Sequence, residues 1–133
     1  MEKINLRTND RIELVDITER IQRIVDAAAV KEGVCFIYCP HTTAGLTINE
    51  NADPSVRRDI IVALNKLVPV GAGYAHSEGN ADSHIKSSLF GATLTVFVKA
   101  GRLALGTWKG IYFCEGDGPR LREVWVKILA DSG

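Results

Sequence analysis

A series of short apolar or alternating segments, each bounded by turn-forming residues, most restricts the fold of this chain. Such segments predict β-strands, and they fall at residues 3–8, 11–15, 34–39, 44–49, 93–98, 110–115 and 122–129. Strands mostly follow strands, which favours antiparallel pairing. With about eight strands and two or three helices, the chain is expected to be an α+β domain with an antiparallel β-sandwich-like core and its helices packed outside.

Local signals predict the connections. Residues 8–10, Thr-Asn-Asp, lie between the first two predicted strands and indicate an opening hairpin. Helical spacing predicts a helix that begins near Thr18 and ends near Lys31. A second helix begins at Asp53-Pro54, and residues 81–89 form a short third one. Because no linker or repeat divides the chain, residues 1–133 are read as a single domain.

Charge and hydropathy exclude several classes of partner. The 16 basic residues equal the 16 acidic ones, and no basic run exceeds the pair Arg57-Arg58, so we expect no nucleic-acid partner. No segment approaches the ~20 apolar residues of a membrane span, and residues 1–8 lack a signal-peptide pattern. We therefore expect a cytoplasmic protein without a membrane partner. A small phosphorylated ligand remains compatible, because a few arginines and backbone N–H groups bind phosphate whatever the net charge.

The three cysteines are Cys35, Cys39 and Cys114. Their odd number and their apolar surroundings predict reduced, buried side chains. A zinc site on Cys35 and Cys39 with His41 is a weaker alternative, since the two cysteines are spaced to face the core of a strand.

Polar side chains are concentrated in residues 41–53 and 76–84, which hold all three histidines. Histidine is the commonest general acid or base near neutral pH and a frequent metal ligand. Glu78 and Asp82 could act as a base or as further ligands. The alternative is structural, because helix caps and turns use the same asparagines and aspartates. Capping explains neither the histidines nor Glu78, which favours a shared site.

A third segment, residues 106–122, has two open interpretations. It could form two hairpin turns around a core tryptophan. Alternatively, Arg120 and Arg122 could pair with an anionic group beside a pocket wall made by Trp108. Neither a Walker phosphate loop nor a serine-hydrolase elbow is present in the sequence.

Three motifs in this order resemble the YjbQ family over nearly the whole chain. They are His-Thr-Thr-Ala-Gly-Leu-Thr-Ile-Asn-Glu-Asn-Ala-Asp-Pro from His41, His-x-Glu-Gly-Asn-Ala-Asp-x-His-x-Lys-x-Ser from His76, and Gly-Thr-Trp-x-Gly-Ile-Tyr-Phe-x-Glu-x-Asp-Gly-Pro-Arg from Gly106. The chain departs from the pattern at Lys109, where a glutamine is expected, and at Gly116, where a bulky apolar residue is expected. Both departures put the ligand preference at that edge of the site in question.

The resemblance implies an α+β homotrimer labelled a secondary thiamine-phosphate synthase, which joins a pyrimidine diphosphate to a thiazole phosphate. It implies a polar pocket with a border at Trp108, Glu115 and Arg120. The pocket would contain the following residues: His41, Thr42, Asn49, Glu50, Asp53, His76, Glu78, Asn80, Asp82 and His84.

Three functions are compatible with these residues. The first is the transferase, with a zinc or magnesium ion stabilising the departing pyrophosphate. The second is a metal-dependent hydrolase of a small phosphoester, and the third is a non-catalytic trimer that binds a phosphorylated metabolite. We favour an enzyme with its site near a subunit boundary. The predicted metal ligands are His41, His76 and His84, and the predicted catalytic residues are His41, Glu78 and Asp82.

Overall fold

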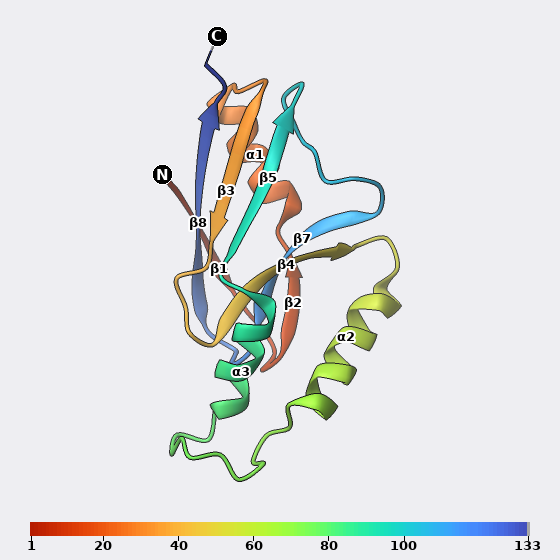
Figure 1. Ribbon diagram of the computed structural model, residues 1–133, viewed down its shortest axis with the longest axis vertical. Coiled ribbons are helices and arrows are strands. Elements are labelled where there is room, and N and C mark those ends of the chain that lie inside the picture. The colour runs from red at the N-terminus through yellow and green to blue at the C-terminus, as the bar shows by residue number, and fades with distance from the viewer. Residues whose placement is uncertain (133) are drawn as a thin grey trace.

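The computed structural model describes residues 1–132, which form strands arranged in two antiparallel sheets and three helices (Figure 1). In chain order the elements are β1 Glu2–Arg7, β2 Glu13–Asp16, α1 Thr18–Ala28, β3 Gly33–Tyr38, β4 Ala44–Glu50, α2 Pro54–Leu67, α3 Ala81–Phe90, β5 Thr93–Lys99, β6 Arg102–Leu103, β7 Lys109–Glu115 and β8 Leu121–Ala130. The expected α+β class with an antiparallel core is confirmed.

The larger sheet has the order β1-β8-β3-β5-β6, and the smaller one has the order β2-β7-β4. One apolar core joins the two sheets and α1, because Ile21 and Val25 of α1, Val124 of β8 and Phe113 of β7 are all fully buried in the same cluster. Helix α1 and the smaller sheet thus cover one face of the larger sheet. The predicted burial of Cys35, Cys39 and Cys114 as free thiols is also confirmed.

The predicted opening hairpin is wrong. Strand β1 pairs with β8, and β2 pairs with β7 in the other sheet. Alternation along a strand indicates which side chains face the core but not which strand lies alongside. Thr8 directs the chain away from a hairpin, because its N–H donates to the Arg120 carbonyl over 3.0 Å. Helix α1 also ends earlier than predicted, at Ala28, since Ala29 adopts a left-handed conformation with φ of 55°.

Helix α2 lies at the periphery of the chain, on the far side of the smaller sheet (Figure 1). None of its residues is fully buried, and Val62 and Leu67 are 45% and 73% exposed. Arg57 packs over the ring of Tyr112 at 5.1 Å, so it does not lie on the solvated side of the helix. No helix within residues 1–132 has the length and apolar character required to cross a membrane.

Candidate functional site

Two buried ion pairs hold the centre of the polar region. Glu115, at the end of β7, receives hydrogen bonds from Arg122 of β8 and from the Thr8 hydroxyl at 2.7 Å. The Asp117 N–H donates to its second oxygen over 3.0 Å. Burial by itself raises the pKa of Glu115, but the hydrogen bonds from Arg122, Thr8 and the Asp117 N–H outweigh it and hold the pKa below its ordinary value. Glu115 is therefore a buried anion that ties three segments together.

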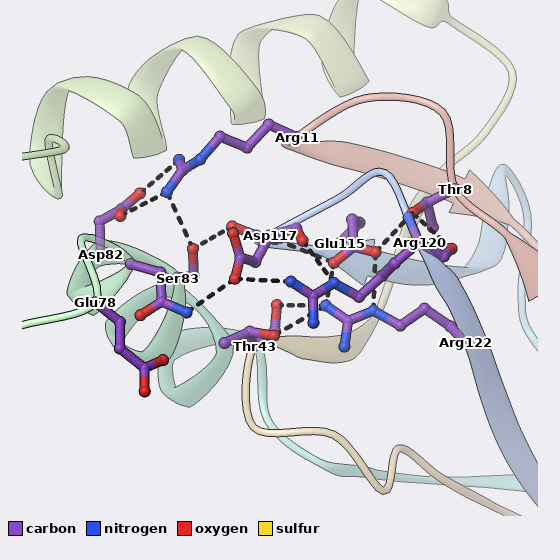
Figure 2. A network of polar contacts seen from close by, with 12 residues as sticks. Thr8, Arg11, Thr43, Glu78, Asp82, Ser83, Glu115, Asp117, Arg120 and Arg122 are labelled. Atoms are coloured by element: carbon purple, nitrogen blue, oxygen red, sulfur yellow. Dashed lines mark hydrogen bonds and ion pairs between the residues drawn. The ribbon is translucent and has the colours of Figure 1, made fainter.

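The second ion pair fixes the first turn of α3. Both oxygens of Asp82 accept from Arg11, at 2.9 and 3.0 Å (Figure 2). One of them also accepts from Lys86 Nζ at 2.8 Å. Lys86 is 1% exposed and donates to Asn65 Oδ1 at 3.0 Å. Burial raises the pKa of Asp82, but the bonds from Arg11 and Lys86 prevail and lower it to about 2.

Further contacts join α3 to the turn between β7 and β8. Ser83 Oγ donates to the Gly116 carbonyl, and Asn80 Nδ2 donates to Asp117 at 2.9 Å. Asp117 also pairs with Arg120 at 3.1 Å (Figure 2). Asn80 Oδ1 is buried and has no hydrogen-bond partner among residues 1–132. These contacts form a polar network that holds the N-terminal end of α3 and leaves the Asn80 Oδ1 acceptor unpaired. The polar network consists of Thr8, Arg11, Thr43, Asn80, Asp82, Ser83, Lys86, Glu115, Asp117, Arg120 and Arg122.

His76 and His84, the latter in α3, form an edge-to-face pair with ring centroids 5.1 Å apart. His84 follows Asn80 by one helical turn, and Glu78 Oε2 lies 3.7 Å from His76 Nε2. His76 and Glu78 are exposed to water, with 42% and 72% of their side chains accessible. Two imidazoles and a carboxylate therefore meet at the surface, where a ligand can reach them.

His41 does not join this pair. Its Nε2 accepts a hydrogen bond from the Glu123 N–H at 3.0 Å, and its ring lies edge-on to Phe113. Burial, and then the positive charge of Arg122, lower the pKa of His41. The neutral His41 side chain accepts this N–H and so connects the segment that precedes β4 with strand β8.

The other predicted pocket residues are divided between the two ends of β4. Its seven residues separate these ends by roughly 20 Å. At the far end, Asp53 accepts from the Ser55 N–H as the N-cap of α2, and the Asn49 side chain accepts from the Glu50 N–H. Trp108 also lies at this far end of β4, and it is 65% exposed. It is therefore not a core tryptophan, and within one chain it does not share a pocket with His84. Thr42 is at the near end, where its carbonyl accepts from Ser87 Oγ at 2.6 Å.

The donors present in one chain do not complete a metal site. Within the described part of the chain, no three His, Cys, Asp or Glu side chains are placed to share an ion. Of the predicted ligands, His76 and His84 are neighbours, whereas His41 Nε2 is engaged by the Glu123 N–H. A zinc or magnesium ion would need at least one further ligand.

Comparison with known proteins establishes the family. Residues 2–131 match the family described as UPF0047 protein YjbQ-like. The chain belongs to the YjbQ-like UPF0047 family. UPF0047 protein MJ1081 of Methanocaldococcus jannaschii is 55% identical over 130 residues, covering 98% of this chain and 94% of the relative. UPF0047 protein YugU of Bacillus subtilis is 45% identical over 130 residues, covering 97% and 98%.

Solved structures of the YjbQ-like family share the fold. An uncharacterised family member from Clostridium acetobutylicum superposes with a TM-score of 0.95 at 49% identity, covering 97% of this chain and 100% of that chain. A hypothetical protein from Aeropyrum pernix K1 gives a TM-score of 0.93 at 32% identity, covering 98% of each chain. The resemblance seen in the three sequence motifs is confirmed.

The two departures from the YjbQ-like pattern have local explanations. Lys109 is opposite Glu50 in the β4–β7 register, so its positive charge is placed across from a carboxylate. Gly116 lies against backbone, because a Cβ there would be 2.7 Å from the Thr43 carbonyl and 3.3 Å from the Ser83 carbonyl. A bulky residue would push α3 away from the turn, so glycine suits the close packing of this chain.

The sequence did not indicate several residues of the polar network: Thr8, Arg11, Thr43, Ser83 and Lys86. One signal was available, since Asp82 and Lys86 are four residues apart on a predicted helix and so lie on one face. Arg11 is 71 residues from Asp82, and no local pattern connects them.

Proposed function

We propose that this YjbQ-like chain is an enzyme that acts on a small phosphorylated metabolite, with His76, Glu78 and His84 at its reacting centre. The reaction to test first is the transfer that joins a pyrimidine diphosphate to a thiazole phosphate. The observation that carries the proposal is the pair of imidazoles, His76 exposed and His84 partly buried, with ring centroids 5.1 Å apart beside the Glu78 carboxylate. Paired histidines beside a carboxylate are suited to proton transfer and to binding an anion.

The surroundings of the pair support a ligand site. Asn80 Oδ1 is buried without a partner in the described residues and lies one turn before His84. Buried acceptors are rarely left unpaired, so a ligand donor or a water would complete it. The ion pairs of Asp82 and Glu115 fix the polar network in one arrangement, which favours precise positioning of the reacting groups.

In the proposed transfer, a C–N bond forms between the thiazole nitrogen and the pyrimidine methylene carbon while the C–O bond to the diphosphate breaks. Pyrophosphate leaves with the electron pair of that bond. His76 and His84, when protonated, would donate hydrogen bonds to its developing negative charge. Glu78 would orient His76 across the 3.7 Å that separates the two side chains. This scheme needs no metal, and the zinc or magnesium ion expected from the sequence stays a prediction.

The scheme uses the other predicted catalytic residues differently. Asp82 has both oxygens bound by Arg11, and Lys86 also donates to one of them, so we assign it to positioning α3. His41 has its Nε2 engaged by the Glu123 N–H, and Glu115, which was predicted at the border of the pocket, is fully buried. We propose structural roles for both.

We expect His84→Ala to lower the rate of thiamine phosphate formation by at least about 100-fold, the typical contribution of a positioned proton donor. The assay mixes the two phosphorylated substrates with wild-type protein and measures thiamine phosphate and pyrophosphate. It is run after treatment with a chelator and again with added zinc or magnesium. Glu19→Gln, on an exposed position of α1, serves as a control that should keep full activity.

The products distinguish the alternatives. Release of inorganic phosphate from a small phosphoester, without joining, would favour the hydrolase. Binding of the thiazole phosphate without turnover would favour the metabolite-binding protein. Activity that requires metal and disappears with it would restore a metal-dependent reaction. Equal rates for wild type and His84→Ala would remove the histidine pair from the mechanism.

We further propose that the chain works as a cytoplasmic homotrimer. The support is helix α2, whose 14 residues include none that is fully buried in the single chain. Ile60 and Ile61 of α2 pack against Tyr112 in the smaller sheet, whereas Val62 and Leu67 stay exposed, and a neighbouring copy would cover them. Three free buried cysteines suit a reducing compartment. A neighbouring copy could also bring the far end of its β4, with Asn49, to the histidine pair.

Introducing charge on α2 should dissociate the assembly. We expect native mass spectrometry to find three chains for the wild type and one for the double variant Val62→Asp/Leu67→Asp. The reason is that a carboxylate buried in an apolar interface lacks a partner. Glu19→Gln should remain trimeric, and a trimer that persists in the double variant would place the interface on another surface.

A further inference from the structure

A groove on the opposite side of the molecule from α2 separates α1 from the edge of the larger sheet. It has a volume of about 450 Å³, within the range of ligand sites. Its lining includes Ile24, Ala27 and Ala28 of α1 and Val126 and Ile128 of β8. A shallower depression of about 350 Å³ shares Arg23 and Ile24 and continues along β1. The result is an elongated groove, apolar between α1 and β8 and more polar along β1, that none of the predicted site residues lines.

The strand beside this groove has an open hydrogen-bonding edge. Strand β8 pairs with β3 along Trp125–Ala130, but its pairing with β1 ends at Val126 opposite Glu2. Figure 1 shows β8 continuing well past the start of β1. Residues 127–130 therefore have a neighbour strand on one side only, among the residues described. An open strand edge next to an apolar groove is the arrangement that binds extended peptides by strand addition.

The charges around the groove favour an acidic partner. Arg23, Lys127 and Arg20 line the groove and its continuation, and the opposing carboxylate there is Glu2. Arg20 is engaged with the Asn5 carbonyl at 2.6 Å, while Arg23 is exposed. The cationic excess attracts acidic side chains and repels basic ones.

We propose that this groove binds an extended segment of another protein, in which acidic and apolar residues alternate, as an added strand antiparallel to β8. Continuing the β1–β8 register places this chain's Met1 opposite Lys127, so the partner strand has its first free position opposite Ile128 and its next opposite Leu129. Side chains of a strand alternate between faces, so the residue opposite Ile128 enters the groove and the residue opposite Leu129 faces the other side, diagonal to Lys127. An apolar residue suits the first position, and Glu or Asp suits the second. The inference is independent of the proposed enzymatic function.

The probe is a fluorescein-labelled, amide-capped peptide of alternating glutamate and valine, Glu-Val-Glu-Val-Glu-Val. Fluorescence anisotropy with the full chain should show saturable binding. Replacing the central valine of the peptide by proline should weaken it at least about tenfold, because proline removes a ladder hydrogen bond. Amide hydrogen exchange should slow on binding at residues 127–130.

Two protein variants test the location. Ala27→Phe fills the groove, and Arg23→Glu reverses the exposed charge, so each should weaken binding at least about tenfold. Arg102→Glu, an exposed charge reversal on β6 outside both the groove and α2, is the matched control and should bind like the wild type. Unchanged affinity in both test variants, or protection that maps to another surface, would overturn the proposal. Binding only after the assembly is dissociated would assign the groove to a second copy and would also overturn it.

Discussion

Replacing Glu115 by alanine is expected to lower the free energy of unfolding by about 3–5 kcal/mol, the usual cost of leaving a buried charge without its partner. Arg122 is 3% exposed, and its guanidinium would lose both bonds to Glu115. It would retain only the 2.9 Å bond to the Thr43 hydroxyl and a longer one to the Thr43 carbonyl. Urea unfolding at neutral pH, followed by circular dichroism, measures the change.

The double variant Glu115→Leu/Arg122→Met is the matched control. It removes both charges and keeps apolar volume, so it should be much less destabilised than Glu115→Ala alone. If the double variant loses as much stability as the single one, shape and not charge determines the effect. In the wild type, the folded pKa of Glu115 lies below its unfolded value. Its stabilising contribution is therefore complete at neutral pH and declines as the pH falls through the ordinary carboxyl range.

The Asp82→Ala variant should lose a similar amount of stability, about 3–5 kcal/mol, because it leaves the buried Lys86 ammonium without a counter-ion. Hydrogen exchange should rise in α3, since Asp82 also anchors that helix to Arg11. The transferase rate should fall with it, because His84 lies on the same helix. The wild-type carboxyl, with a pKa of about 2, should keep its stabilising effect until the pH falls below its ordinary value of 3.8.

A comparison variant separates burial from charge. Arg11→Gln removes a partner whose side chain is 36% exposed, and a partly exposed ion pair contributes below about 1 kcal/mol. We therefore expect Arg11→Gln to be much milder than Asp82→Ala. Equal losses in the two variants would contradict the assignment of Lys86 as the decisive buried charge.

Local patterns were sufficient for most of the secondary structure. The Asp53-Pro54 start predicted α2, which the structure gives as Pro54–Leu67. Residues 81–89 were predicted as a helix and form Ala81–Phe90. The two-residue strand β6 was missed because Arg102 and Leu103 are too few to show alternation. Strand partners were not predictable, as the pairing of β1 with β8 illustrates, since pairing depends on residues more than a hundred positions apart.

The site was predicted less well because its residues come together from segments that are far apart in the sequence. The motif that begins at His41 and ends at Pro54 looks continuous in sequence, yet β4 carries its two ends roughly 20 Å apart. His76 and His84 were found together because a short loop and one helical turn connect them. His41, by contrast, received a partner from β8, which no local spacing could indicate.

The position of β8 also has a consequence for synthesis of the chain. Of the elements described, this strand is synthesised last, yet it lies between β1 and β3 in the larger sheet. Until it emerges, both of those strands present unpaired edges in the nascent polypeptide, and Glu115 has no arginine to neutralise it. Completion of the larger sheet therefore follows translation of β8, and until then the open edges of β1 and β3 are available for aggregation.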